Sequence, residues 1–507
     1  MSNLSSLNFE VPAKPTLLED RKDADTTWRV SKSLPSVTNI ADVLASSAEA
    51  IKEDADALGE QSTFDLAYAA LKSFASLDAD AQRAACGLVA DAVQQAARAA
   101  KRALAASAAD KELAQRRSVL KAAVYLQTWL VQEAEKMTTL AAGAALAVKA
   151  PVRGKGAKKK KKDEDEEVIG EAFSWEDHRE TAALRLLEAL DLDLTVLWGH
   201  RSPDEAFLGL FSRAAYAILE QPSAIKLAAF RESLWRLIAL PAVKFDQGEA
   251  TINELVRILL GSEHAATHLA ELMQRLLEEH DAVKLVATLL GELATLPTSE
   301  MGADAAGPKN IAVFLHALAA RAPLMLVANL ELLQPHLASE AYSLRCGAVS
   351  AHGQLLIQVN ALRGANPEAA AAMPALLAVP LNRLADVSSF VRSRALQTLG
   401  LVVESRALPI PQLQQVAAAG LARLADKNAN VRRGALQLFA TLLDFNPFGP
   451  SLNRPLLEER RDVLKEAIAE AAPEEEVEAP AAAAEEGAGE EGAEAPPAPP
   501  KKVPWRG

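Results

Sequence analysis

The sequence predicts an all-α protein in which helix pairs stack one after another. Half of its 507 residues are hydrophobic, and Ala and Leu predominate over aromatic residues, a composition that favours helices over sheets. Apolar residues recur at spacings of three and four along most of the chain, and no segment shows the period of two that is typical of strands. A block of about forty residues also occurs twice near the end of this helical region.

Changes in composition divide the chain into six predicted segments. The boundaries follow from where the helical spacing begins and stops, and from where charged or Pro- and Gly-rich runs replace it. The segments are a polar N-terminal segment (1–60), an N-terminal helical domain (61–150), a disordered Lys-rich and acidic linker (151–172), a helical-repeat array (173–452), a terminal helix (453–472) and a disordered acidic tail rich in Ala, Pro and Gly (473–507).

Charge and cysteine content narrow the class of protein. The net charge is −13, but residues 474–494 alone hold nine Glu and no Lys or Arg, so the helical part is close to balanced and lacks a global basic field for nucleic acid. Cys86 and Cys346 are far apart, which indicates a reducing compartment rather than a disulfide framework. We find no secretory signal and no apolar run of about 20 residues, so we expect a soluble cytosolic or nuclear protein without membrane contact.

The repeated block identifies the kind of array. Residues 386–404 and 426–444 align at an offset of forty, and "ASEAYSLRCGAVSAHGQLL" is a looser copy in which Arg345 precedes Arg392 by forty-seven. Periods of about 40–47 residues with two helices per unit are typical of HEAT and armadillo repeats, so the predicted fold is a HEAT-repeat α-solenoid. The aligned pairs are Asp386 with Asp426, Val391 with Val431, Arg392 with Arg432, Ala395 with Ala435, and Leu396 with Leu436.

The repeated polar residues have an expected structural role. We place Asp386 and Asp426 in the turn between the two helices of a unit, where each carboxylate caps backbone N–H groups of the second helix. Arg392 and Arg432 start the second helices, where each guanidinium bonds turn carbonyls or the Asp of a neighbouring unit. In the second of these helices, apolar residues recur on one face and should pack on the partner helix and the next unit: Val431, Ala435, Leu438 and Leu442.

Two groups of basic residues are candidates for binding. Arg394, Lys427 and Arg433 lie near the repeat turns and should point outward, where they are candidates for contact with DNA phosphate or an acidic partner, although a solvated face is the interpretation that the sequence favours slightly. The linker contains a run of five lysines, which is a candidate nuclear import signal. These are Lys158, Lys159, Lys160, Lys161 and Lys162.

No residue pattern predicts catalysis, and we expect no catalytic residue, bound metal, cofactor or small-molecule substrate. His264 and His268 have a spacing that suits zinc, but Ala265 stands where the HExxH motif has Glu, and we find no third ligand. Neither cysteine has a neighbouring His that could act as its base. A metal enzyme built on the array therefore rests on the two histidines alone.

Several long blocks resemble one family in order along the chain. They are "FSWEDHRETAALRLLEALDLDLTVLWGHRSPDEAFLGLFSRAAYAILEQP", "GPKNIAVFLHALAARAPLMLVANLELLQPHLASEAYSLRCGAV", "ADVSSFVRSRALQTLGLVVESRALPI" and "LARLADKNANVRRGALQLFATLLDFNPFGPSL". These blocks resemble the condensin complex subunit 1 family, the D-type HEAT-repeat subunits of condensin I. The resemblance covers roughly residues 170–452, fits residues 62–150 more loosely, and corresponds to the family's N-terminal third to half.

The resemblance implies a non-enzymatic regulatory subunit in a five-protein complex. Its expected partners are a kleisin subunit, SMC subunits and, through the complex, chromosomal DNA. The expected process is mitotic chromosome condensation, and the expected location is the nucleus and mitotic chromosomes with a cytoplasmic pool. The alternative is a generic HEAT-repeat scaffold or importin-like transport adaptor, which should bind basic cargo peptides on an acidic surface.

Overall fold

The computed structural model describes residues 9–15, 18, 39–149, 172–297, 305–447 and 454–471. Within these ranges the chain forms α-helices and short 3-10 helices without β-strands, which confirms the all-α prediction. The chain divides into two compact units, Met1–Phe445 and Asn446–Gly507. The second unit contributes one described helix, α22 (Arg454–Ala471). Among the described residues, we find no helix whose length and apolar character would let it cross a lipid bilayer.

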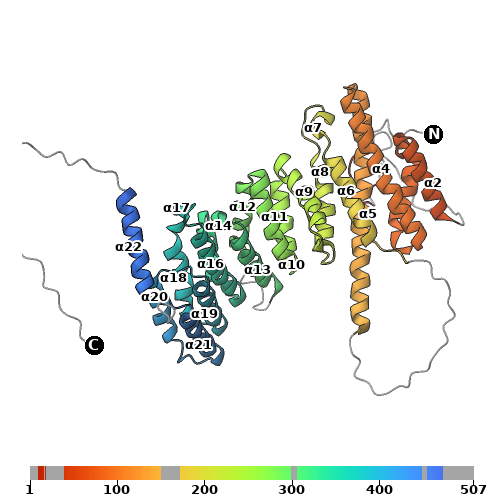
Figure 1. Ribbon diagram of the computed structural model, residues 1–507. Helices are drawn as coiled ribbons and strands as arrows, with labels where there is room; N and C mark the ends of the chain where they lie inside the picture. The colour runs from red at the N-terminus through yellow and green to blue at the C-terminus, as the bar shows by residue number, and fades with distance from the viewer. Residues whose placement is uncertain are drawn as a thin grey trace, which may run out of the picture. The chain divides into compact units, whose positions relative to one another are not determined.

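The first unit begins with helices α2 to α5. α4 packs against both α2 and α5 (Figure 1). α2 buries Leu44, Ala48 and Ile51 on one face, so the helical part of the chain starts before the expected boundary at residue 61. The elements are α2 (Ile40–Glu53), η2 (Ala55–Gly59), α3 (Gln61–Lys72), η3 (Phe74–Ser76), α4 (Ala79–Ala105) and α5 (Asp110–Lys149).

A buried ion pair joins these helices to the array that follows. Glu135 on α5 accepts hydrogen bonds from Arg179 Nε at 2.7 Å and Nη2 at 2.9 Å, and from Trp175 Nε1 at 2.8 Å. Arg179 lies on α6 (Glu176–Leu190), beyond the predicted linker, which itself falls almost wholly outside the described residues. The regions predicted as an N-terminal domain and an array therefore belong to one compact unit.

From α6 onward, helix follows helix as the sequence predicts (Figure 1). Five helices, α11, α13, α16, α19 and α21, each pack on the next and form what we call the second-helix layer. The elements are α7 (Leu194–Leu197), α8 (Glu205–Leu219), η4 (Ala224–Lys226), α9 (Ala228–Lys244), α10 (Gly248–Gly261), α11 (Ala265–His280), α12 (Val283–Thr295), α13 (Ala306–Arg321), α14 (Pro323–Ala328), η5 (Leu330–Leu333), α15 (Gln334–Ala338), α16 (Tyr342–Leu362), α17 (Pro367–Ala370), α18 (Met373–Asn382), η6 (Arg383–Ala385), α19 (Ser389–Glu404), α20 (Ile410–Leu421) and α21 (Ala429–Asp444).

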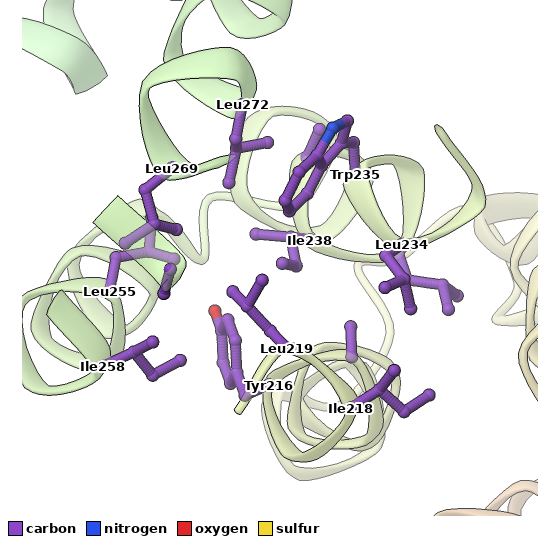
Figure 2. Close-up of a cluster of buried hydrophobic side chains, with 14 of the residues drawn as sticks. Tyr216, Ile218, Leu219, Leu234, Trp235, Ile238, Leu255, Ile258, Leu269 and Leu272 are labelled. Atoms are coloured by element: carbon purple, nitrogen blue, oxygen red, sulfur yellow. The ribbon is translucent and has the colours of Figure 1, made fainter. Parts of the chain in front are cut away.

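The core of the array forms where neighbouring pairs meet. Figure 2 shows one such cluster, in which side chains of α8, α9, α10 and α11 converge. Full burial of one large apolar side chain contributes roughly 1.5–3 kcal/mol. A single helix pair cannot cover its own apolar face, so stacking supplies most of this burial. The labelled residues are Tyr216, Ile218, Leu219, Leu234, Trp235, Ile238, Leu255, Ile258, Leu269 and Leu272.

The aligned apolar repeat positions share their burial, except at Leu396 and Leu436. Val431, Ala435 and Leu438 are buried as predicted, and Leu442 is half-buried. Leu396 is buried because α21 approaches it: its Cδ1 lies 3.3 Å from where a Cβ on Gly434 would stand. Its counterpart Leu436 is 62% exposed, since no further helix of this unit follows α21 in the second-helix layer.

Candidate functional site

Asp386 and Asp426 lie in the turns before α19 and α21, as the repeat alignment predicts. Oδ1 of Asp386 accepts the N–H of Ser388 at 2.8 Å, and Oδ1 of Asp426 accepts that of Asn428 at 2.9 Å. Ser388 and Asn428 are the N-cap residues themselves. The prediction that the carboxylates cap N–H groups inside the helices is therefore wrong by one position: each aspartate closes the turn that leads into its helix.

The first rung of an arginine–aspartate ladder joins α16 to the turn before α19. Arg345 Nε and Nη2 donate to the two carboxylate oxygens of Asp386 at 3.1 and 3.0 Å. Its Nη1 donates to the carbonyls of Ser339 and Glu340, in the turn that precedes its own helix. Arg345 was not among the predicted site residues, although its spacing of forty-seven from Arg392 was the signal that pointed to it.

The second rung repeats this geometry one unit later. Arg392 Nε and Nη2 donate to the two oxygens of Asp426, both at 2.9 Å, and its Nη1 donates to the carbonyls of Asp386 and Val387. The sequence predicted that Arg392 bonds either turn carbonyls or the aspartate of a neighbouring unit. Its guanidinium does both. Arg432 bonds the carbonyls of its own turn in the same way, and no aspartate faces it within the described residues.

The ladder also sets the charge state of its carboxylates. The Arg392 hydrogen bonds lower the pKa of Asp426, and burial only partly opposes them. Burial alone would raise the pKa of Asp386, but hydrogen bonds from Arg345 and from the Ser388 amide outweigh it and hold the pKa below its usual value. Both aspartates therefore stay ionised, and bidentate charge-assisted bonds fix each second helix against the next.

Of the three outward basic candidates, one lines a groove and two do not. Arg394, Lys427 and Arg433 are exposed, and their side chains have no hydrogen bond or ion pair within the described part of the chain. Arg394 lines a groove of about 530 Å³ between α13, α16 and α19. Lys427 lies in the turn before α21 and Arg433 is the fifth residue of that helix, and neither lines that groove. The five candidate lysines 158–162 fall outside the described residues.

The histidines considered for zinc have other surroundings. His264 Nε2 lies 3.2 Å from the carbonyl oxygen of Leu219, and burial lowers the pKa of His268, whose Nδ1 is 3.9 Å from Glu271 Oε2. Among the described residues, no three or more His, Cys, Asp or Glu side chains group in a way that could hold a metal ion.

The two thiols are not set up as nucleophiles. Burial raises the pKa of Cys86 to about 12 and also raises that of Cys346, so both remain protonated near neutral pH. A nucleophile would need the opposite shift. Cys86 is buried and Cys346 is half-buried.

Part of the chain matches a known protein family. Residues 79–251 match a family model described as non-SMC mitotic condensation complex subunit 1, N-terminal. The match starts with α4, so it includes α4 and α5 of the N-terminal region whose resemblance was looser, as well as the start of the array.

Three curated relatives carry related names. The chain is 32% identical over 324 residues to condensin complex subunit 1 of Mus musculus (61% of this chain, 23% of the relative) and 31% over 285 residues to that of Homo sapiens (55% and 20%). It is 27% identical over 311 residues to the condensin-1 complex subunit of Arabidopsis thaliana (61% and 22%). The aligned part spans about a fifth of the length of these relatives. A solved engineered protein aligns at 16% identity and a TM-score of 0.31, covering 80% of this chain and 96% of its own, too weak a likeness to bear on function.

Proposed function

This chain is related to the N-terminal portion of condensin complex subunit 1, and on that premise we propose that it is a non-enzymatic HEAT-repeat subunit of the condensin complex. The observation that carries the proposal is the family match over residues 79–251, which crosses from the N-terminal helices into the array. Its process is mitotic chromosome condensation, and its location is the nucleus and mitotic chromosomes, with a cytoplasmic pool.

Within the complex, the chain binds the kleisin and SMC subunits through its helical surfaces. The ladder supports this role because Arg345 and Arg392 fix the spacing of successive second helices, which gives a partner a rigid surface. Preorganisation of this kind reduces the entropy lost on binding. An importin-like adaptor is less well supported, because it should present acidic residues to basic cargo, whereas the groove beside Arg394 has no Asp or Glu in its lining.

DNA engagement is the second part of the proposal. Arg394, Lys427 and Arg433 are exposed cations without a hydrogen-bond or ion-pair partner among the described residues, and such side chains bind phosphate without reading sequence. Each phosphate contact contributes roughly one unit to the slope of log affinity against log salt concentration. Replacing all three by Glu in the full chain should therefore reduce that slope by up to about three for a DNA duplex. The control replaces three exposed cations elsewhere: Lys101, Lys111 and Arg201.

Co-expression with the kleisin subunit from the same genome tests the proposal. We expect the full chain and the kleisin to co-elute in one-to-one stoichiometry, and SMC head fragments to join them in a second preparation. A folded, monodisperse chain that elutes apart from the kleisin would count against subunit membership. If the triple-Glu variant and its control give the same slope of log DNA affinity against log salt concentration, the three cations do not contact DNA. That result would not bear on subunit membership.

A further inference from the structure

A groove runs along the second-helix layer above α16. Its floor is a stripe of α16 side chains at helical spacing, most of them small and all half-buried. From its first to its last residue the stripe covers about 21 Å at 1.5 Å per residue, or about four helical turns. The floor residues are Ser343, Cys346, Ser350, Gln354 and Ile357.

The two walls carry apolar side chains that the fold leaves uncovered. Val313 on α13 is 40% exposed, and Phe390 and Leu401 on α19 are 63% and 56% exposed, although all three line this one groove. Phe390 stacks on Tyr342 with a centroid distance of 5.0 Å, which holds the ring in place. Large apolar side chains gathered in one depression mark a binding site, whereas single exposed ones are ordinary.

Close helix packing fixes the groove before any ligand arrives. A Cβ on Gly347 would stand 2.2 Å from the Cβ of Ala312, and one on Gly353 would stand 2.1 Å from Cγ2 of Thr398. Only glycine permits this approach of α13 and α19 to α16. The Arg345 rung of the ladder also holds α16 to the turn before α19, so the walls and floor form one rigid unit.

The side chains that line the groove carry positive charge, which favours an acidic ligand. Lys309 and Arg394 line the walls, and no Asp or Glu lies among the lining residues. Arg394 has no ion-pair or hydrogen-bond partner within the described residues, and Ser343 Oγ is buried on the floor without a hydrogen-bond partner there. The groove therefore offers an apolar track beside an unneutralised cation, which complements a segment with apolar and acidic side chains.

We propose that this groove binds an amphipathic, acidic helical segment of a partner protein. Apolar side chains at spacings of three and four pack against Val313, Phe390 and Leu401, and a carboxylate at the segment's edge pairs with Arg394. A helix suits the site because helices line the groove and no strand edge lies among its lining residues to pair with an extended peptide. The inference deepens the proposed function and rests on it for the identity of the partner, but not for the chemistry of the groove.

The test starts with peptide selection on the full chain. Random 16-residue peptides displayed on phage are selected on the chain and counter-selected on a Phe390→Ser, Leu401→Ser variant, whose changes lie on exposed side chains and leave the core intact. We expect enriched peptides to be net acidic with apolar residues at helical spacing. Basic or uncharged enriched peptides, or no enrichment after counter-selection, would overturn the proposal.

A synthetic peptide of an enriched sequence then gives two quantitative readouts. Arg394→Glu should weaken its binding about tenfold, because it removes one charge pair and adds a repulsion, while Arg201→Glu, on the exposed loop before α8, should change it less than about twofold. Saturating peptide should also slow alkylation of half-buried Cys346 on the groove floor, while buried Cys86 should stay unmodified with and without peptide, which shows that the fold is intact. Unchanged Cys346 alkylation would place the peptide elsewhere.

The two proposals fail in different ways. If the chain co-elutes with the kleisin but selects no acidic amphipathic peptide, the subunit role is supported and the proposed peptide binding by the groove is refuted. If the chain binds such peptides through Arg394 but elutes apart from the kleisin, the proposed peptide binding by the groove is supported and the subunit role is refuted.

Discussion

Removal of the Asp386 carboxylate should destabilise the array locally, at α19 and the turn before it. The side chains of Asp386 and Arg345 are 2% and 10% exposed, and the pair forms two hydrogen bonds. Asp386→Ala leaves the Arg345 cation buried with only carbonyl partners and deprives the Ser388 amide of its acceptor. Breaking a buried pair from one side costs about 3–5 kcal/mol, so we expect the local unfolding free energy of α19 to fall by this amount.

Hydrogen exchange measured by mass spectrometry suits this prediction, because a repeat array does not unfold in one step. Peptides from α16 and α19 should lose protection, while peptides from α4 and α5 should keep it. Asp444→Ala is the matched control, since that aspartate is exposed on α21, and it should change protection by less than about 0.5 kcal/mol. A double change, Asp386→Leu with Arg345→Met, should recover much of the loss because no charge stays buried.

The reasoning fails if Asp386→Ala and Asp444→Ala give equal protection in α19. It fails equally if the double change is as damaging as Asp386→Ala alone, because the harm would then come from packing rather than from the unpaired guanidinium.

Other predictions follow from packing, titration and connectivity. Gly347→Ala should lower the free energy of unfolding by about 1–3 kcal/mol through overpacking. Gly400→Ala, with open space around its Cβ position, should raise the free energy of unfolding by about 0.5–1 kcal/mol. Burial lowers the pKa of His336 to about 4, so its contribution to stability is present above about pH 6.5 and is lost as the pH falls toward 4. The loss approaches about 3 kcal/mol, and His336→Gln should flatten urea unfolding midpoints across that range. Cleavage at a protease site inserted within residues 151–170 should leave two fragments that co-elute, and Glu135→Ala should let them separate on dilution.

Local periodicity and the repeat were sufficient to predict the array. Val391 and Val431 both point into the core, and Arg392 bonds as the alignment suggested, because these features depend on helix spacing and one turn. The ladder's first member, Arg345, was visible only as a looser copy. The exposure of Leu436 differs from that of Leu396 because burial in an array depends on the next helix, which a repeat pattern does not specify.

The features that were missed depend on contacts between distant residues. Glu135 and Arg179 are separated by 44 positions across a segment of quite different composition, and nothing local marks them as partners. The groove depends on how closely Gly347 approaches Ala312 on another helix, and a glycine within a helix does not by itself signal such contact. Outward placement of Arg394 followed from the pattern, but its place beside an apolar track did not.

Contact of Lys427 and Arg433 with DNA or an acidic partner stays a prediction, as does nuclear import through the lysine run. The first is tested by the salt dependence described above. The second is tested by replacing Lys158–Lys162 with Gln in the full chain and following its distribution between nucleus and cytoplasm. An unchanged nuclear fraction would refute nuclear import through the lysine run and would not bear on the repeat array.

The most direct test of the account is to purify the tagged full chain from mitotic cells of its own organism and quantify by mass spectrometry what accompanies it. We predict a kleisin and two SMC subunits at near-equal stoichiometry, retained through gel filtration and released together with the chain from chromosomes. Recovery of the chain without these subunits, or with transport factors and basic cargo in their place, would contradict the account.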